Sequence, residues 1–267
     1  MTFIEKEQIR KNFCRGASTY DQYAKVQKKM AQELSNKITA VGKEFREILE
    51  IGCGTGFLTE LLAKEFPRAN ILALDISPRM IEVAQKKLSS YPNITYLVED
   101  GENLCINGSF DLIVSNAVFQ WFNNYLQPFA LYHKNLKEDG CFIFSTLGEQ
   151  TFRELGQALS FLGLESPKEA LINAGELGRI LTTCGFAKWT VEEQLLKDYH
   201  ASARELLVGI KKIGAQSHCF SARGFCLKGG DIFKLAVFLN SRYREGKGVY
   251  ITYQVLYGFA QKSRQTN

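Results

Sequence analysis

Closely spaced glycines in the first third of the chain form the pattern best suited to binding a small charged ligand. The segment that ends at Gly56 reads Glu-Ile-Leu-Glu-Ile-Gly-Cys-Gly-Thr-Gly. Gly52, Gly54 and Gly56 would let the backbone turn tightly and approach a ligand without an intervening Cβ. The dinucleotide fingerprint G-x-G-x-x-G would need a glycine where Phe57 stands. Glu50 precedes the first glycine by two residues, and its carboxylate would repel a pyrophosphate but suit a cationic ligand.

Acidic side chains stand at the ends of the next two apolar runs. Asp75 lies near the end of the run 71–76, where a carboxylate can accept hydrogen bonds from both hydroxyls of a ribose. Met80 opens the following helical stretch and could pack on the same ligand. The run 94–98 is followed by Glu99-Asp100-Gly101-Glu102. These positions indicate a nucleoside-like ligand.

Amide and aromatic side chains follow the fourth apolar run. Residues 110–115 lead into Asn116-Ala117-Val118-Phe119-Gln120-Trp121. Taken singly, Asn116 could be a turn residue, Trp121 a core aromatic residue and Asp75 a helix N-cap. Their recurrence in order, each at the end of an apolar run, favours a single ligand site.

The elements that must position these residues alternate between two patterns. Short β-branched runs alternate with stretches of helical spacing, which predicts βαβ units and a parallel sheet covered on both faces. The runs are 47–51, 71–76, 94–98, 110–115 and 141–146, and the helical stretches are 57–66, 78–89 and 126–136. We therefore predict an α/β fold with a doubly wound, mostly parallel, seven-stranded sheet.

Two regions depart from this alternation. We expect residues 1–44 to form a helical lid, with Thr2 in a capping box and a helix over about Tyr20–Ala40. Residues 45–199 would form the Rossmann-like core, residues 200–247 a basic cap insertion, and residues 248–267 the last strand and the C-terminus. In the cap, Ser202 could begin a helix over Ala203–Ile213 that ends at Gly214. The lid and the cap are expected to lie together over the C-terminal edge of the sheet.

Composition excludes several classes of protein. The chain has 267 residues, 45% hydrophobic and 23% charged, the balance of a folded globular protein rather than a disordered one. Its apolar runs are too short to span a bilayer, and residues 1–15 lack the apolar region of a secretory signal. Seven cysteines without a C-x-x-C pair and only three histidines predict free thiols in the cytoplasm and no metal site.

Positive charge is concentrated in the last quarter of the chain. Residues 201–267 hold eleven Lys and Arg against three Asp and Glu, a net charge of +8, whereas the whole chain has +5. This distribution suggests an acidic partner, namely a nucleic acid, an acidic protein or an anionic small molecule. A solvated, lysine-rich surface is the alternative.

The E-x-G-x-G-x-G pattern resembles the first motif of S-adenosylmethionine-dependent methyltransferases of the doubly wound class. In that class the acidic residue, here Glu50, lies near the cationic methionine moiety. The resemblance also implies that Asp100 meets the adenine amino group and that the fourth strand ends beside the transferred methyl. The implied cofactor-binding residues are Glu50, Gly52, Cys53, Gly54, Gly56, Asp75, Ile76, Met80, Asp100, Gly101, Glu102 and Asn116.

A narrower resemblance covers nearly the whole chain. The chain is similar to the malonyl-acyl-carrier-protein O-methyltransferases of biotin synthesis. The more specific segments are Tyr-Asp-x-x-Ala at 20–24, Gln-Trp at 120–121 and Ile-Gly-Ala at 213–215. Gln216-Ser217 departs from that family's usual Thr-Asn or similar pair.

This resemblance implies methyl transfer from S-adenosylmethionine to the free carboxylate of a malonyl thioester, carried by acyl carrier protein or coenzyme A. A carboxylate is already ionised at neutral pH, so no general base is required. We expect Tyr20, Gln120 and Trp121 at the reaction centre. Tyr20 would bind the substrate carboxylate together with a cation from Arg204, Lys211 or Lys212.

Three other functions are open to a chain of this kind. Another small-molecule methyltransferase would keep the cofactor site and change the lid. A nucleic-acid amino methyltransferase would usually carry an Asn/Asp-Pro-Pro-aromatic tetrapeptide where Ser115-Asn116-Ala117-Val118 stands. A protein that binds the cofactor without catalysis is disfavoured by the intact glycine motif with Asp75 and Asp100. We expect no nucleic-acid or membrane partner.

Overall fold

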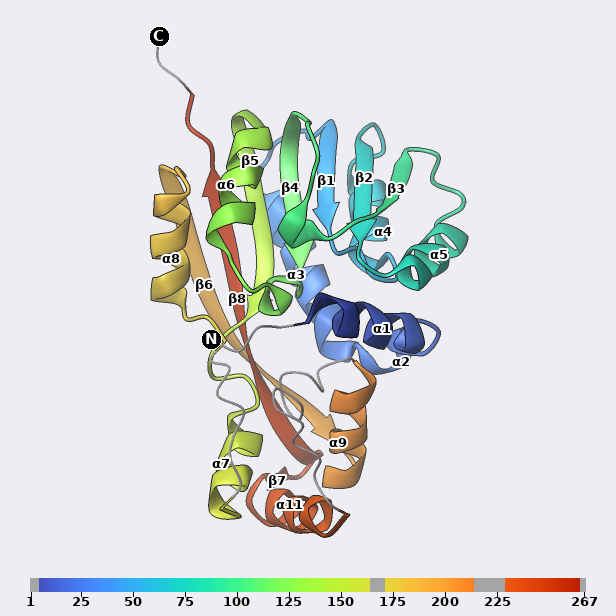
Figure 1. Cartoon of the computed structure of the whole chain (residues 1–267), viewed down its shortest axis with the longest axis vertical. Coiled ribbons are helices and arrows are strands. Elements are labelled where there is room, and N and C mark those ends of the chain that lie inside the picture. The colour runs from blue at the N-terminus through green and yellow to red at the C-terminus, as the bar shows by residue number, and fades with distance from the viewer. Residues whose placement is uncertain (1–4, 164–170, 214–228, 265–267) are drawn as a thin grey trace.

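A mixed β-sheet forms the centre of the computed structural model, which describes residues 5–163, 171–213 and 229–264 (Figure 1). Seven strands follow in the order β3-β2-β1-β4-β5-β8-β6. Their bounds are β1 (Glu47–Ile51), β2 (Asn70–Asp75), β3 (Ile94–Val98), β4 (Phe110–Asn116), β5 (Leu136–Leu147), β6 (Lys188–His200) and β8 (Gly248–Gln261). The first five are parallel, while β8 runs antiparallel to β5 and β6. The predicted doubly wound sheet is confirmed, and the short β7 (Arg244–Glu245) adds an eighth strand beside β8.

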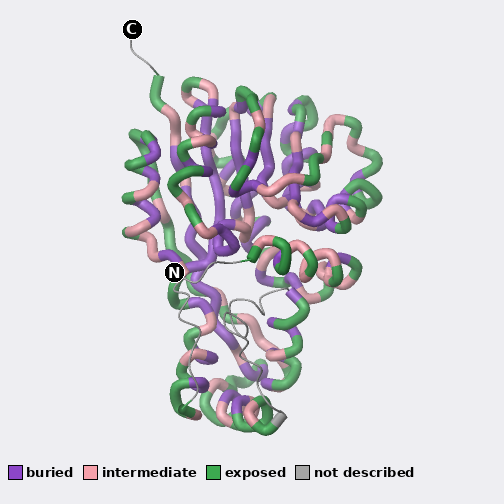
Figure 2. The backbone as a smooth tube through the Cα atoms, viewed as in Figure 1, coloured by how far each residue is buried: buried purple, intermediate pink, exposed green. Residues whose placement is uncertain are grey.

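Helices cover the two faces of the sheet because successive strand residues point to opposite sides. On one face, Ile48 of β1 packs in a cluster with α3 (Lys25–Ala40) and α4 (Phe57–Glu65). On the other face, Leu49 packs in a cluster with α6 (Leu126–Asn135) and α8 (Ala174–Thr183). Figure 2 shows the central strands of the sheet buried between these helices, whereas the edge strands β3 and β6 are largely exposed.

The N-terminal helices lie across the end of the sheet (Figure 1). They are α1 (Lys6–Gly16) and α2 (Tyr20–Tyr23), followed by α3. The single helix predicted over Tyr20–Ala40 is wrong, because the backbone at Ala24 leaves the helical region with φ −78° and ψ 43°. This break turns α2 toward the strand ends while α3 packs on the sheet. Thr2 lies outside the described residues.

A second group of helices surrounds the projecting ends of β6 and β8 (Figure 1). It consists of α7 (Arg153–Phe161), α9 (Ala203–Lys212) and α11 (Gly229–Arg242). Ser202 is the N-cap of α9, and its hydroxyl accepts a hydrogen bond from the Glu205 N–H at 3.2 Å. Gly214, Gln216 and Ser217 lie outside the described residues. Among the described helices, none combines the length and apolar character needed to cross a membrane.

Three short elements connect this framework to the ligand-binding edge. They are α5 (Pro78–Lys87) after β2, the 3-10 helix η1 (Gly101–Asn103) after β3 and the 3-10 helix η2 (Phe119–Trp121) after β4. Each begins within a few residues of a strand end, so their first residues gather at the carboxyl edge of the parallel strands.

Candidate active site

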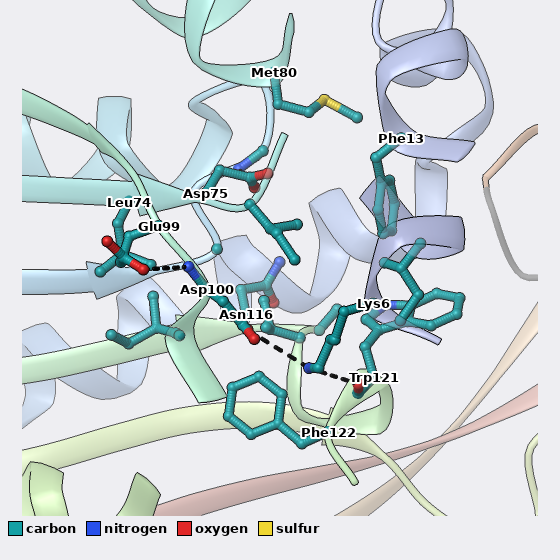
Figure 3. Close-up of a pocket in the computed structure, with 18 of the residues that line it drawn as sticks. Lys6, Phe13, Leu74, Asp75, Met80, Glu99, Asp100, Asn116, Trp121 and Phe122 are labelled. Carbon is teal, nitrogen blue, oxygen red and sulfur yellow. Dashed lines mark hydrogen bonds and ion pairs between the residues drawn. The ribbon is translucent and has the colours of Figure 1, made fainter. Parts of the chain in front are cut away.

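A pocket enclosing about 630 Å³ opens at the carboxyl ends of the parallel strands, under α1 and α2 (Figure 3). Its walls come from α1 and α2 and from the ends of β1 to β4 with the segments that follow them. The lining residues are Lys6, Ile9, Phe13, Tyr20, Ile51, Gly52, Gly54, Leu74, Asp75, Ile76, Met80, Glu99, Asp100, Gly101, Asn116, Ala117, Val118, Trp121 and Phe122.

The glycine turn after β1 forms one wall of this pocket. Gly52, Gly54 and Gly56 have φ values of 70°, 53° and 81°, a region that side-chain-bearing residues rarely adopt. A Cβ on Gly52 would lie 2.3 Å from Val118 Cγ2, so the turn packs closely against the segment after β4. A Cβ on Gly54 would meet nothing within 4 Å, because this glycine faces the pocket.

Asp75 stabilises the same turn and faces the pocket. Its Oδ2 accepts the Gly54 N–H at 2.9 Å, and its Oδ1 accepts the Ser77 N–H at 2.8 Å. Burial raises the pKa of the Asp75 carboxyl to about 6, although these two N–H groups oppose the rise. Each carboxylate oxygen has two lone pairs, so both retain acceptor capacity toward the pocket.

A second pocket of about 400 Å³ adjoins the first and shares Tyr20, Gly52, Gly54 and Asn116 with it. Its wall includes Glu50, whose side chain is 1% exposed. Neither Glu50 Oε2 nor Gln27 Oε1, both within the described residues, has a hydrogen-bond partner. Burial raises the pKa of Glu50 to about 7, assisted by the charge of Asp75 and opposed by the Thr59 hydroxyl.

Two unpartnered acceptor oxygens in one pocket wall are costly unless a donor binds there. A ligand ammonium would satisfy both and would pair with the Glu50 charge. This arrangement fits the cationic end of S-adenosylmethionine. Cys53, which lies in the same pocket wall, is a buried free thiol.

The opposite end of the first pocket is formed by Glu99, Asp100 and Gly101. Asp100 caps η1, with Oδ1 accepting the Glu102 N–H at 3.1 Å and Oδ2 accepting Asn103 Nδ2 at 2.8 Å. Glu102, also predicted to bind the cofactor, does not line the pocket. Its Oε1 accepts the backbone N–H groups of Asn123 and Asn124 at 2.8 and 2.7 Å.

Asn116, the last residue of β4, and Trp121 of η2 both reach the pocket, as Figure 3 shows. Asn116 Nδ2 donates to the Gln27 carbonyl at 3.1 Å, and its Oδ1 accepts the Ser145 hydroxyl at 2.7 Å. Gln120 does not line the pocket. Its Nε2 donates to the Ala117 carbonyl at 2.6 Å, and its Oε1 accepts the Thr146 hydroxyl at 3.3 Å, so both ends are used within the fold.

Tyr20 lies where the two pockets meet. Its ring lies 6.2 Å from that of Phe13, which in turn contacts Trp121 edge-on at 5.5 Å. Burial and the charges of Asp75 and Asp21 hold the pKa of the Tyr20 hydroxyl well above its ordinary value. The hydroxyl therefore stays protonated and can donate a hydrogen bond at neutral pH.

The cations predicted from the basic cap are not in the pocket walls. Arg204, Lys211 and Lys212 are exposed residues of α9 and line neither pocket. Among the described residues, the cations in these walls are Lys6 and Lys28, from α1 and α3. Lys28 Nζ donates to the Asp21 carbonyl at 2.9 Å.

Sequence reasoning missed Lys6, Phe13, Gln27 and Lys28. All four are in the N-terminal helices, where the sequence shows helical spacing but no sign of which face meets the site. The described residues contain no group of three or more His, Cys, Asp or Glu side chains arranged to bind a metal ion.

Comparisons with known proteins give a consistent result. A family model described as "Methyltransferase domain" matches residues 48–140. A malonyl-acyl-carrier-protein O-methyltransferase of Priestia megaterium is 37% identical over 276 residues, covering 98% of this chain and 100% of the relative. One of the same name, numbered 1, from Ilyobacter polytropus is 38% identical over 226 residues, covering 84% of each chain.

Solved structures support the fold. The YcgJ protein of Bacillus subtilis matches with a TM-score of 0.61 at 15% identity, covering 87% of this chain and 99% of that chain. The plantazolicin methyltransferase BpumL, solved with S-adenosylhomocysteine, matches with a TM-score of 0.53 at 16% identity, covering 97% and 98%. At these identities the likeness concerns the fold alone.

Proposed function

Because this chain belongs to the malonyl-acyl-carrier-protein O-methyltransferases, we propose that it methylates the free carboxylate of a malonyl thioester with S-adenosylmethionine. The product is the malonyl methyl ester that starts pimeloyl and biotin synthesis. The observation that carries this function is the buried Glu50 carboxylate with an unpartnered oxygen, at the edge where parallel strands present ligands.

Different pocket residues would contact three parts of the cofactor. Glu50 and Gln27 would hold the ammonium of the methionine moiety, Asp75 the ribose hydroxyls, and Asp100 the adenine amino group. Gly52, Cys53, Gly54, Ile76, Met80, Gly101 and Asn116 supply the remaining wall. When bound, S-adenosylmethionine supplies a methyl group on a positively charged sulfur, which needs no further activation. We do not retain Gln120 as a contact residue, since both ends of its amide bond within the fold. Glu102 is not retained either, because Oε1 accepts two backbone N–H groups and Oε2 is paired with Lys6.

The substrate carboxylate is ionised at neutral pH, so the protein needs to orient it rather than deprotonate it. Tyr20, protonated and located between the two pockets, would donate a hydrogen bond that holds one carboxylate oxygen. Asn116 and Trp121 would shape the space around the other. Orientation of this kind can lower a barrier by roughly 7–11 kcal/mol. Excessive stabilisation of the carboxylate would oppose catalysis, because the anion loses its charge in the transition state.

The basic helix α9 is better suited to docking than to the reaction centre. A Cβ on Gly16 would lie 3.5 Å from the Lys212 carbonyl, so the C-terminal end of α9 adjoins the end of α1. Arg204, eight residues earlier, lies about 12 Å further along the helix axis. We propose that Lys211 and Lys212 receive an acidic carrier protein beside the lid, with residues 1–44 as lid and 200–247 as cap. The free thiols also suit a cytoplasmic location.

One assay tests the reaction directly. The protein is incubated with isotope-labelled S-adenosylmethionine and malonyl-, succinyl- or acetyl-carrier protein. The mass of the acyl group is then measured by mass spectrometry. We expect a methyl ester on the malonyl group and none on the acetyl group, which has no free carboxylate. A Tyr20→Phe variant should bind S-adenosylhomocysteine normally but form the ester more slowly. Methylation of acetyl-carrier protein, or none of malonyl-carrier protein, would reject the proposal.

Another small-molecule methyltransferase activity would leave the cofactor pocket unchanged and differ only in the acceptor. The relatives do not favour it, since they share one acceptor in their names. The sequence Ser115-Asn116-Ala117-Val118 continues to argue against methylation of a nucleic-acid base.

A further inference from the structure

Lys6 extends from the first turn of α1 into the adenosine end of the pocket (Figure 3). Its Nζ lies 2.5 Å from Glu102 Oε2 and 3.6 Å from Asp100 Oδ1. It also donates a hydrogen bond to the Trp121 carbonyl at 3.0 Å and lies 4.6 Å from the centre of the Phe122 ring. One ammonium group therefore joins the lid helix to the segments after β3 and after β4.

The acceptor of this ammonium is firmly held. Glu102 is only 8% exposed, and its other oxygen accepts two backbone N–H groups, those of Asn123 and Asn124. Lys6 is itself 20% exposed. A shielded ion pair of this kind, with one partner held by backbone N–H groups, is stronger than a pair on the open surface.

The rest of α1 contributes little to the core. The helix, described over its whole length, buries a single residue, Ile9. Arg10, Lys11 and Arg15 bond to residues of α1 itself. Cys14 makes one further polar contact, 3.2 Å from the Ser77 hydroxyl. A helix with so few buried contacts opens at low free-energy cost, so a single strong anchor can control its position.

We propose that Lys6 is a positioning residue that fastens α1 over the adenosine end of the pocket and thereby slows the release of S-adenosylmethionine and of S-adenosylhomocysteine. The inference rests on the cofactor site of the proposed function. Lys6 acts through Glu102, and the closed helix keeps Phe13 and Ile9 against the pocket. The adenosine end is released when the ion pair opens.

Release rates test this proposal. Trp121 lines the pocket, and the chain has two tryptophans, so a Trp189→Phe background makes Trp121 the reporter of binding. Stopped-flow fluorescence at several S-adenosylhomocysteine concentrations gives the association and dissociation rates. The variants are Lys6→Ala, Lys6→Arg, Glu102→Gln and the double variant Lys6→Ala with Glu102→Gln. Lys11→Ala, an exposed lysine of the same helix, is the matched control.

We expect Lys6→Ala to release S-adenosylhomocysteine about tenfold faster with a nearly unchanged melting temperature. Lys6→Arg should restore most of the slow release, and Lys11→Ala should behave as the parent. Because Lys6 acts through Glu102, the double variant should be no faster than either single variant. In steady state, Lys6→Ala should raise KM for S-adenosylmethionine while kcat is maintained.

Unchanged release in Lys6→Ala, an equal change in Lys11→Ala, or additive effects in the double variant would overturn the inference. A fall in kcat with unchanged release would overturn it as well, by placing Lys6 in methyl transfer. Failure of the parent protein to bind S-adenosylhomocysteine would instead reject the cofactor site, so the two failures are distinguishable.

Discussion

Glu50 shows how a single buried carboxyl group can favour a bound cation. Its side chain is 1% exposed and one of its oxygens has no partner, so the free protein retains an unfavourable group. Because burial raises the pKa of Glu50 to about 7, the protonated and ionised forms of the free site are about equally populated at neutral pH, and the protonated form dominates at lower pH. A cationic ligand prefers the ionised form, and binding must therefore release a proton at lower pH.

The first prediction follows from this proton release. With a free-state pKa of about 7, the ionised fraction of Glu50 falls from about one half at pH 7.0 to about 3% at pH 5.5, so affinity for S-adenosylhomocysteine should fall by at least about 15-fold. The α-amino group of the ligand stays protonated in this range. Calorimetric titration across the range measures the effect. Glu50→Gln should bind more weakly at pH 7 and show a shallower fall, centred near pH 6, where Asp75 titrates. Equal pH profiles for both proteins would contradict the role of Glu50.

A second prediction concerns Asp75 and the ribose. Removing the whole side chain would leave both the Gly54 and the Ser77 N–H without an acceptor, whereas Asp75→Asn keeps one oxygen to accept one of them and is therefore the milder test. Loss of a hydroxyl acceptor should cost about 1–3 kcal/mol of binding free energy. The 2′-deoxy analogue of S-adenosylhomocysteine should bind the parent protein more weakly than S-adenosylhomocysteine does. In Asp75→Asn this difference should shrink; if it stays the same, Asp75 does not hold the ribose.

At the scale of the elements, the turn between β1 and α4 contains one glycine that the packing of the fold requires and another that faces the pocket. Gly52 and Gly54 both have positive φ, but only Gly52 is enclosed by a neighbouring side chain. We therefore predict that Gly52→Ala destabilises the protein by roughly 2–4 kcal/mol, through backbone strain and the clash with Val118.

Gly54→Ala should cost only about 1 kcal/mol of stability, from backbone strain alone, but about tenfold in affinity because its Cβ enters the pocket. Urea unfolding and calorimetric titration of the pair measure the two effects separately. Equal losses of stability in both variants would show that the two glycines do not divide these tasks.

The elements that could be predicted from the sequence are those whose burial produces a clear pattern. The ranges of β1 and β3 agree with the predicted ones because each is a short β-branched run between polar residues. The strand β6 was not located, since it lies at the edge of the sheet and alternates poorly, with Glu192, Glu193 and Lys197 exposed. The break at Ala24 was also missed, because tertiary packing rather than a Gly or Pro separates α2 from α3.

At the scale of the whole molecule, the site could be predicted where it follows the topology of the sheet. The glycine turn, Asp75 and Asp100 come directly after parallel strands, so their convergence follows from the strand order. The pocket residues of α1 and α2 could not be predicted, because their position depends on how these helices pack across the strand ends, and the local sequence does not determine that packing. Lys6 reaches Glu102 across a separation of 96 residues, which no spacing rule anticipates.

The charge of the molecule is also unevenly distributed, and the final prediction concerns its use. Lys211 and Lys212 are exposed in the last turn of α9, within the segment that has a net charge of +8. Lys86 is exposed in the last turn of α5, outside that segment. Its neighbour Lys87 lies 3.6 Å from Glu60 and over the ring of Phe57, which lines the second pocket. Lys86→Glu, compared with Lys212→Glu, is therefore the matched control for charge reversal.

If the basic helix steers an acidic carrier protein, kcat/KM for malonyl-carrier protein should fall steeply with salt. The screening length decreases from about 30 Å at 0.01 M to about 8 Å at 0.15 M. Malonyl-coenzyme A, much smaller, should show a shallower fall. Reversing Lys211 and Lys212 to Glu should lower kcat/KM for the carrier-protein substrate more than for the coenzyme A substrate. The single reversal Lys212→Glu should show the same bias, whereas Lys86→Glu should affect both little. Equal salt slopes for the two substrates would show that the helix does not dock a protein. Equal losses after reversal at α9 would assign these lysines to the malonyl group or its phosphopantetheine arm, because those are the parts that both substrates share.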